Sequence, residues 1–188
     1  PTCKFIDTPW NEKRDVAIYR GGCTPTIDVE TADFHARFFV RSDLCDRYAN
    51  ATLLDIGIYN EKVCSGAHKY DFCKRCQPCS GKPRIEPAET PCYKYQIQVD
   101  GHGPSKDATI RKLWSKSVMF LVRHDSGVQL ELFFYPLLEP YKHYIPTSVT
   151  DLESSVQWCV DNDSACEEIA EEAYKVTIKM LDAGFVTS

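Results

Sequence analysis

The sequence predicts an α/β fold: a mainly parallel sheet with helices on both faces. Short apolar runs, typical of buried strands, alternate with longer segments of helical spacing along the 188 residues. The first run, over 15–20, leads into Gly21-Gly22, and a helix and a second strand follow, which is the order of a βαβ unit. We expect one domain over 1–188, interrupted by a cysteine-rich insertion over 61–92.

The first part of the chain holds two strands and a helix. The run 15–20 reads as a buried strand because apolar and small residues dominate it. A helix is expected over 32–41, since Phe34 and Phe38 recur at helical spacing and Thr31 can cap its start. The apolar run 53–58 is the second expected strand.

After the insertion the alternation resumes to the end of the chain. The expected strands are 93–99, 118–122 and 143–145, and the expected helices are 105–116, 132–138, 151–160 and 163–181. Four or five strands alternating with helices favour a parallel sheet over a sandwich or a helical bundle.

Charge and composition exclude several classes of protein. The net charge of −5 offers no basic footprint, so we expect no nucleic-acid partner. No apolar run approaches the roughly 20 residues that span a bilayer, so we expect no membrane span. The chain begins with Pro1 rather than Met, and we expect either a processed chain or part of a longer protein.

Ten cysteines predict an oxidising compartment, the secretory-pathway lumen or the extracellular space. We expect five disulfides among Cys3, Cys23, Cys45, Cys64, Cys73, Cys76, Cys79, Cys92, Cys159 and Cys166. Two sequons, at Asn50 and Asn162, indicate N-glycosylation and the same compartment.

The spacing of the cysteines leaves one alternative and favours one pairing. Cys73, Cys76 and Cys79 form a C-x2-C-x2-C run that could supply three thiolates to zinc, and this zinc-binding module is the minor alternative to disulfides. Cys159 and Cys166 are expected to pair, because one ends a helix and the other begins the next.

Two glycine loops follow expected strands and could hold an anion. Arg20 precedes Gly21-Gly22, where free backbone N–H groups and a guanidinium suit a pyrophosphate; a simple tight turn explains the same residues. The loop beginning at Gly101 ends at Ser105, the expected N-cap of a helix, and its alternative reading is a turn plus cap. The lone His143 is expected to be structural.

Three segments resemble glycosyltransferase family 90, which includes protein O-glucosyltransferases, xylosyltransferases and fungal capsule-associated proteins. They are the strand 93–101, the run Leu-Phe-Phe-Tyr-Pro-Leu-Leu-Glu-Pro-Tyr-Lys-His-Tyr-Ile-Pro over 132–146, and Asp151-Leu152 with the helix that contains Trp158. Upstream, 10–13 and 18–22 are similar to the family's tryptophan, lysine and Arg-Gly-Ser segment, so the resemblance spans almost the whole chain.

The resemblance implies the C-terminal, Rossmann-like half of a GT-B enzyme, the half that holds a UDP-sugar. The catalytic carboxylate would come from a first half that has no counterpart in this sequence. The resemblance suggests a nucleotide-sugar site made of Arg20, Gly21, Gly22, Arg37, Gly101, Ser105 and Arg111. Of these, Arg20 and Gly21 match the family's residues, and Arg37 and Arg111 are candidates to replace two of its arginines.

Three of the family's donor contacts are altered here. Gly22 replaces a serine, Asp107 replaces an arginine, and Leu132 replaces an acidic residue. A carboxylate beside a pyrophosphate is unfavourable without a compensating cation, and no cofactor other than a UDP-sugar ligand is expected. The sequence therefore favours a non-catalytic glycosyltransferase-like domain that binds other protein chains through the face turned toward the missing half. The alternative is the UDP-sugar-binding half of an active enzyme; no catalytic residue is assigned in either case.

Overall fold

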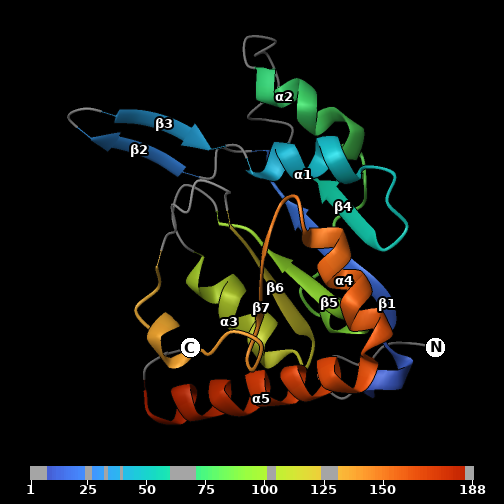
Figure 1. Cartoon of the computed structure of the whole chain (residues 1–188), viewed down its shortest axis with the longest axis vertical. Helices are drawn as coiled ribbons and strands as arrows, with labels where there is room; N and C mark the ends of the chain where they lie inside the picture. Colours follow the sequence, from blue (N-terminus) through green and yellow to red (C-terminus); the bar gives the residue numbers. More distant parts are fainter. Residues whose placement is uncertain are drawn as a thin grey trace.

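The computed structural model describes residues 8–23, 27–31, 34–38, 40–59, 71–100, 105–123 and 131–184. For 27–31, 34–38 and 71–73 the backbone alone is described. Within these residues the chain forms one parallel sheet, a separate hairpin and helices on both faces of the sheet (Figure 1). The predicted α/β class is confirmed.

Five strands, all paired in parallel, build the sheet in the order β4-β1-β5-β6-β7. The strands are β1 (Arg14–Gly21), β4 (Leu54–Ile58), β5 (Tyr93–Gln98), β6 (Val118–Arg123) and β7 (Ile145–Ser148). Four of the five predicted strand positions agree to within one residue. The fifth, expected at 143–145, overlaps β7 at Ile145 alone.

The order of the strands reverses between β1 and β5. From β1 the chain moves to its neighbour β4 on one side, then returns to β5 on the other side and continues outward to β6 and β7. In doubly wound sheets of this kind, the crevice for ligands lies at the carboxyl ends of the two strands that flank the reversal. The topology alone therefore directs attention to the ends of β1 and β5.

The helix predicted over 32–41 is wrong in its first part. Strands β2 (Ile27–Thr31) and β3 (Phe34–Phe38) form an antiparallel hairpin there, which projects from the domain at the upper left of Figure 1. Phe34 and Phe38 are four residues apart, a spacing that places them on one face of a helix but also on one face of a strand. The helix α1 begins at Val40 and ends at Tyr48.

The remaining helices follow the sequence closely, with one exception. Helices α3 (Lys106–Trp114), α4 (Leu152–Asp161) and α5 (Asp163–Asp182) are confirmed. The helix expected over 132–138 is a single 3-10 turn, η6 (Tyr135–Leu137), because Pro136 lacks the N–H that would continue a helix. His143 is structural as expected, since its Nδ1 accepts the backbone N–H of Glu139 at 2.9 Å.

Two apolar clusters hold the sheet between its helices. On one face α1, α4 and the start of α5 cover alternate residues of the central strands, including Tyr95 of β5 and Phe120 of β6, whose rings meet edge to face at 6.0 Å. On the other face α3, the end of α5 and the segment around Phe134 cover Met119 and Leu121. Helix α5 runs along one end of the sheet, at the bottom of Figure 1.

Two buried lysines tie the start of the chain to the amino ends of the strands. Lys13 donates from Nζ to the carbonyl oxygen of Ser115 and to Ser117 Oγ, each at 3.0 Å, and burial lowers its pKa to about 7. Lys94 forms ion pairs of 2.7 Å with Asp15 and Asp163. The contacts of Lys13 give this residue of the family-like 10–13 segment a structural role.

The cysteine-rich segment is stapled to the sheet by disulfides. Cys23, which follows β1, is bonded to Cys76 at the end of helix α2 (Asp71–Cys76), and Cys159 is bonded to Cys166 as predicted. Cys92 is also in a disulfide, whose other half lies outside the described side chains. Because Cys76 is already bonded to Cys23, it cannot serve as a thiolate ligand, and the zinc alternative loses one of its three cysteines.

The prediction of five disulfides stays a prediction at two positions. Cys45 and Cys79 carry free, buried thiols in the structure. Residues 61–70 of the predicted insertion, with Cys64, lie outside the described residues, as does Cys3. Cys73 is described by its backbone alone.

The burial of aromatic side chains in this core predicts which of them stabilise the fold. Phe120 has no exposed area, whereas Phe133 is 60% exposed. We expect Phe120→Ala to lower the free energy of unfolding by about 3–5 kcal/mol, because it leaves a cavity between strands and helices. Phe133→Ala is the matched control and should change it by less than about 0.5 kcal/mol. Urea unfolding followed by circular dichroism measures both; equal losses would contradict this description of the core.

Candidate functional site at the reversal of strand order

A cavity of about 210 Å³ lies over β1 and β5, the two strands that flank the reversal of strand order. Its cationic lining comes from three separate parts of the chain: strand β1, the end of the cysteine-rich segment, and helix α3. The four cations that line it are Arg20, Arg84, Arg111 and Lys112. Among the predicted site residues, Arg20 and Arg111 are therefore brought together in one cavity.

Polar side chains of β5 continue along the same face of the sheet. Gln96 lines the cavity and donates from Nε2 to Ser115 Oγ at 2.9 Å. Gln98 is next on this face, and its Nε2 donates to the Asp100 carboxylate at 3.3 Å. Both glutamines are at most 2% exposed. A strand that buries amides toward a cavity provides fixed hydrogen-bonding groups there, because such groups are costly to bury unpaired.

Lys112 is the most perturbed base of the site. Burial, together with repulsion from Arg111 and Arg41, lowers its pKa to about 7. Its Nζ donates to Gln98 Oε1 at 2.5 Å. Near neutral pH this lysine is thus divided between its charged and neutral forms, and a bound anion would favour the charged form.

Asp100, at the end of β5, is the carboxylate of this group. Burial raises its pKa, while hydrogen bonds from Gln98 and from the backbone N–H of Ser105 oppose the rise. Arg41 and Lys112 also favour its charged form. The site therefore places one carboxylate among several cations, and its net charge is positive near neutral pH.

Arg20 is engaged by the protein itself. Its Nη2 forms an ion pair of 2.7 Å with Asp55 of β4, its Nη1 donates to the Asp55 carbonyl oxygen at 2.8 Å, and its Nε donates to the Pro83 carbonyl oxygen at 3.0 Å. Lys82 binds the other carboxylate oxygen of Asp55 at 2.7 Å. Burial would raise the pKa of Asp55, but Arg20 and Lys82 outweigh it and the pKa is lowered. Arg20 thus joins two strands to the wall of the cavity.

Two glycines provide the space that these side chains occupy. A Cβ atom on Gly57 would lie 2.8 Å from Arg20 Cδ, and one on Gly21 would lie 2.2 Å from Tyr19 Oη. Both distances are far below a van der Waals contact. Gly21, predicted as a loop residue, is instead the last residue of β1, and its lack of a side chain has a packing reason.

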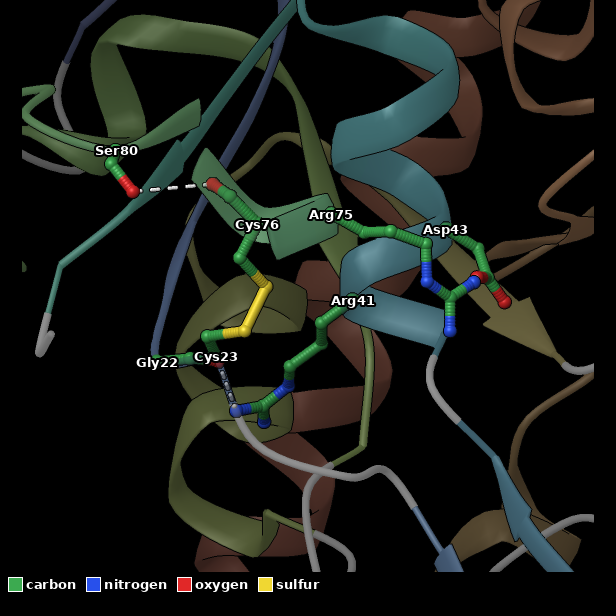
Figure 2. The surroundings of a disulfide bond; sticks show 7 residues. All are labelled: Gly22, Cys23, Arg41, Asp43, Arg75, Cys76 and Ser80. Carbon is green, nitrogen blue, oxygen red and sulfur yellow. Dashed lines mark hydrogen bonds and ion pairs between the residues drawn. A yellow bond between two sulfur atoms is a disulfide. The ribbon is translucent and has the colours of Figure 1, made fainter. Parts of the chain in front are cut away.

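Arg41 is a functional candidate that the sequence analysis did not assign. It lies in the first turn of α1, and its Nη1 donates to the carbonyl oxygen of Gly22 at 3.1 Å (Figure 2). Its charge also acts on Asp100 and on Lys112. The end of β1, the start of α1 and the end of β5 therefore converge through this arginine.

The wall opposite α3 comes from the cysteine-rich segment. Ser80 pairs with Ile58 at the edge of β4, and Arg84 places its guanidinium 5.8 Å from the centre of the Tyr59 ring. Ile85 packs against the small apolar cluster that contains Ile18, and both residues line the cavity. Charge-assisted and apolar contacts together hold this irregular wall in place.

The remaining predicted site residues lie on α3, on β3 or outside the described residues. Ser105 is the N-cap residue of α3, but its hydroxyl makes no capping hydrogen bond. Asp107 is exposed in the first turn of the same helix. Arg37 lies on β3, where the backbone alone is described, and Gly101 lies outside the described residues.

Of the modification sites, Asn50 is exposed after α1, and Asn162 is exposed between α4 and α5, donating from Nδ2 to the Trp158 carbonyl oxygen at 2.8 Å. The part of the chain that the structure describes contains no cluster of three metal-binding side chains. No helix within it has the length and apolarity required to cross a membrane.

The fold and this cavity define a doubly wound α/β domain with a basic site at its reversal point. The chain belongs to glycosyl transferase family 90, whose model matches residues 6–188. The family resemblance drawn from the sequence is thereby confirmed.

Comparison with known proteins agrees with this assignment. Protein O-glucosyltransferase 1 of Rattus norvegicus is 37% identical over 184 residues, 95% of this chain and 40% of that protein. Protein O-glucosyltransferase 3 of Homo sapiens is 35% identical over 43% of this chain and 15% of its own length. An uncharacterized protein, 179R, of Invertebrate iridescent virus 6 is 27% identical over 93% of this chain and 16% of its own length.

A solved structure has the same fold. The crystal structure of TarM superposes with a TM-score of 0.50 at 14% sequence identity, covering 98% of this chain and 36% of that one. In each of these comparisons the chain matches less than half of the other protein.

The engagement of Arg20 can be tested through its partner. We expect Asp55→Asn to lower the free energy of unfolding by about 1–3 kcal/mol at neutral pH, because it leaves the buried guanidinium without its counter-ion. The pKa of Asp55 is lowered in the folded protein, so its charge stabilises above the ordinary value of 3.8. The difference between the two proteins should therefore shrink as the pH falls below that value.

Chemical denaturation at several pH values measures this difference. Asp46→Asn, an exposed change on α1, is the control and should have little effect. A difference for Asp55→Asn that stays constant down to strongly acid pH would contradict the ion pair.

Proposed function

We propose that this domain binds the diphosphate of a UDP-sugar in the basic cavity and acts as the donor-binding part of a protein O-glycosyltransferase. The observation that supports this most is the convergence of Arg20, Arg84, Arg111 and Lys112 on one cavity at the reversal of strand order. Membership of the family and the named protein O-glucosyltransferase relatives give the class of reaction.

The cations of helix α3 are the ones available to a ligand, because Arg84 on the wall pairs with Glu86 at 3.8 Å. Among the described residues, Arg111 makes no ion pair with a carboxylate, whereas the guanidinium of Arg20 is bound to Asp55. We therefore assign the phosphate contacts to Arg111 and Lys112, and we assign to Arg20 the task of holding the wall. Arg111 also offers the charge that compensates for Asp107 on the same helix.

The size of the cavity limits what it can hold. Pockets for whole small-molecule ligands usually have volumes of about 300–1,000 Å³. A cavity of about 210 Å³ suits the charged diphosphate rather than a complete nucleotide sugar. The nucleoside and the sugar would extend past the carboxyl ends of the strands, as ligands of doubly wound sheets do.

In such a reaction the domain would stabilise the leaving group. Transfer of the sugar to a hydroxyl leaves UDP with additional negative charge, and fixed cations aimed at that charge lower the barrier. A general base must remove the proton of the acceptor hydroxyl. We assign no such base within the chain, so the base would come from another part of the enzyme or from a partner chain.

A second function has its own support. Phe133, Leu137 and Tyr141 are exposed apolar side chains, 60, 43 and 65% accessible, within one segment of nine residues. Exposed apolar side chains that gather on a surface often mark contacts with other proteins. The alternative is therefore a non-catalytic domain that binds or assembles with other protein chains. The disulfides support the secretory pathway or the extracellular space as the location for either function.

Titration with UDP separates the two functions. We expect the purified domain to bind UDP with micromolar affinity, and Arg111→Ala to weaken binding by about 10- to 100-fold through loss of a charge-assisted contact. Lys175→Ala removes an exposed cation of α5 and is the control, with unchanged affinity. Calorimetry that detects no binding at millimolar UDP would contradict donor binding and favour the assembly function.

The pKa of Lys112 predicts how the affinity depends on pH. Because this pKa is about 7 in the unliganded protein and an anion raises it, binding takes up a proton. Affinity for UDP should fall by up to about tenfold per pH unit above 7 until the pKa of the complex is reached. The variant Lys112→Gln should lose this dependence and retain only that of the nucleotide, whose terminal phosphate titrates near pH 6. Identical pH profiles for the two proteins would contradict a role for Lys112.

A further inference from the structure

Cys45 and Cys79 bring two free thiols together inside the core. Cys45 lies in α1 and Cys79 ends the 3-10 turn η4 (Gln77–Cys79), and neither has any exposed area. Helix α1 packs against η4, and both cysteines belong to the same apolar cluster. The thiols are close enough for a hydrogen bond between them to be the largest influence on the pKa of each. Two thiols in direct contact are a different arrangement from two isolated buried cysteines.

Cys79 is the more acidic thiol of the pair. The hydrogen bond from Cys45 lowers the pKa of the Cys79 thiol, and the charges of Lys82 and Arg20 lower it further, whereas the same hydrogen bond and burial raise the pKa of the Cys45 thiol. A disulfide already forms close by in the sequence. Cys76, which is bonded to Cys23 (Figure 2), precedes Cys79 by three residues. A protein that has formed that disulfide has been exposed to an oxidant able to oxidise a neighbouring thiol pair.

We propose that Cys45 and Cys79 form a disulfide in the oxidised protein and that this bond fastens the cysteine-rich wall of the cavity to helix α1. In the reaction the two thiols lose two protons and two electrons, one Sγ–Sγ bond forms, and an external disulfide of a protein oxidoreductase or of glutathione is reduced to two thiols. The inference does not depend on whether the cavity binds a nucleotide.

The burial of both sulfurs determines at which stage this oxidation can occur. An external disulfide cannot reach either thiol in the folded protein, so oxidation has to occur during folding or in a locally opened state. Once formed, the bond would lie in the core, protected from reductants by the same packing. It would act with Cys23–Cys76 as a pair of crosslinks from the segment 76–79 to the sheet and to α1.

Peptide mapping without reduction tests the pairing in the unmutated protein. The protein is produced in a secretory host, alkylated with iodoacetamide under denaturing conditions, and digested with trypsin. Trypsin releases 21–37, 42–47 and 76–84, and these contain the four cysteines concerned. We expect one species in which all three peptides are joined by two disulfides, with Cys45 and Cys79 unalkylated.

Other species would overturn the proposal. A species of two peptides, 21–37 and 76–84, with Cys45 and Cys79 alkylated would mean that the thiols stay reduced. Fragmentation at the Gln77–Pro78 bond separates Cys76 from Cys79, so it identifies which of them is joined to 42–47. Attachment of 42–47 to Cys76 would also contradict the proposed pairing.

Thermal stability provides a second readout. The double variant Cys45→Ala/Cys79→Ala should have a melting temperature lower than that of the oxidised protein by about 4–16 °C, the shift expected for loss of one disulfide in a domain of this size. To separate the crosslink from packing, both proteins are reduced under denaturing conditions and refolded in reductant, which removes the bond despite its burial in the folded state; the gap should then narrow. A gap that does not change on reduction would contradict a stabilising Cys45–Cys79 bond.

Discussion

The contact between Arg20 and Asp55 is the constraint on which the candidate site depends. It joins the two strands at one edge of the sheet, and through Lys82 and the Pro83 carbonyl it fixes the path of the chain that returns from β4 to β5. The Arg20 side chain is 8% exposed, so the charge is held in a place where losing its partner is costly. The same guanidinium that could have met a phosphate is thereby used to build the wall of the cavity.

The cavity itself results from a departure from regular α/β construction. In a doubly wound sheet the connection between consecutive parallel strands usually includes a helix that covers one face. Between β4 and β5, which lie on either side of β1, the described chain instead forms the short α2, two 3-10 turns and irregular backbone that pairs with β4 at Ser80. Incomplete cover leaves Ile18, Gln96 and neighbouring groups lining a hollow rather than packed beneath a helix. Disulfides and ion pairs replace the helix as the means of holding this connection.

Much of the fold could be predicted from the sequence because its periodic patterns are strong. The buried strands and the helices α4 and α5 bury apolar residues at regular spacing, and the structure agrees closely with them. The hairpin at 27–38 was missed because Phe34 and Phe38 satisfy both periods. Arg20 and Arg111 could be nominated for the site from loop position and resemblance. Arg41 and Lys112 could not, since their importance arises from the meeting of three elements distant in sequence. The sequence did contain one signal for the polar face of β5. Polar residues recur there at every second position, at Gln96, Gln98 and Asp100.

The space left by Gly57 has a consequence for how this sequence can change over generations. Any side chain at position 57 would collide with the stem of Arg20, so the two positions are not free to vary independently. A lineage that gains a larger residue at 57 must first or simultaneously shorten residue 20, which would leave Asp55 with Lys82 as its remaining cation. We therefore expect residues 20, 55 and 57 to change together, and relatives that lack one of them to have rebuilt this edge of the sheet with different chemistry.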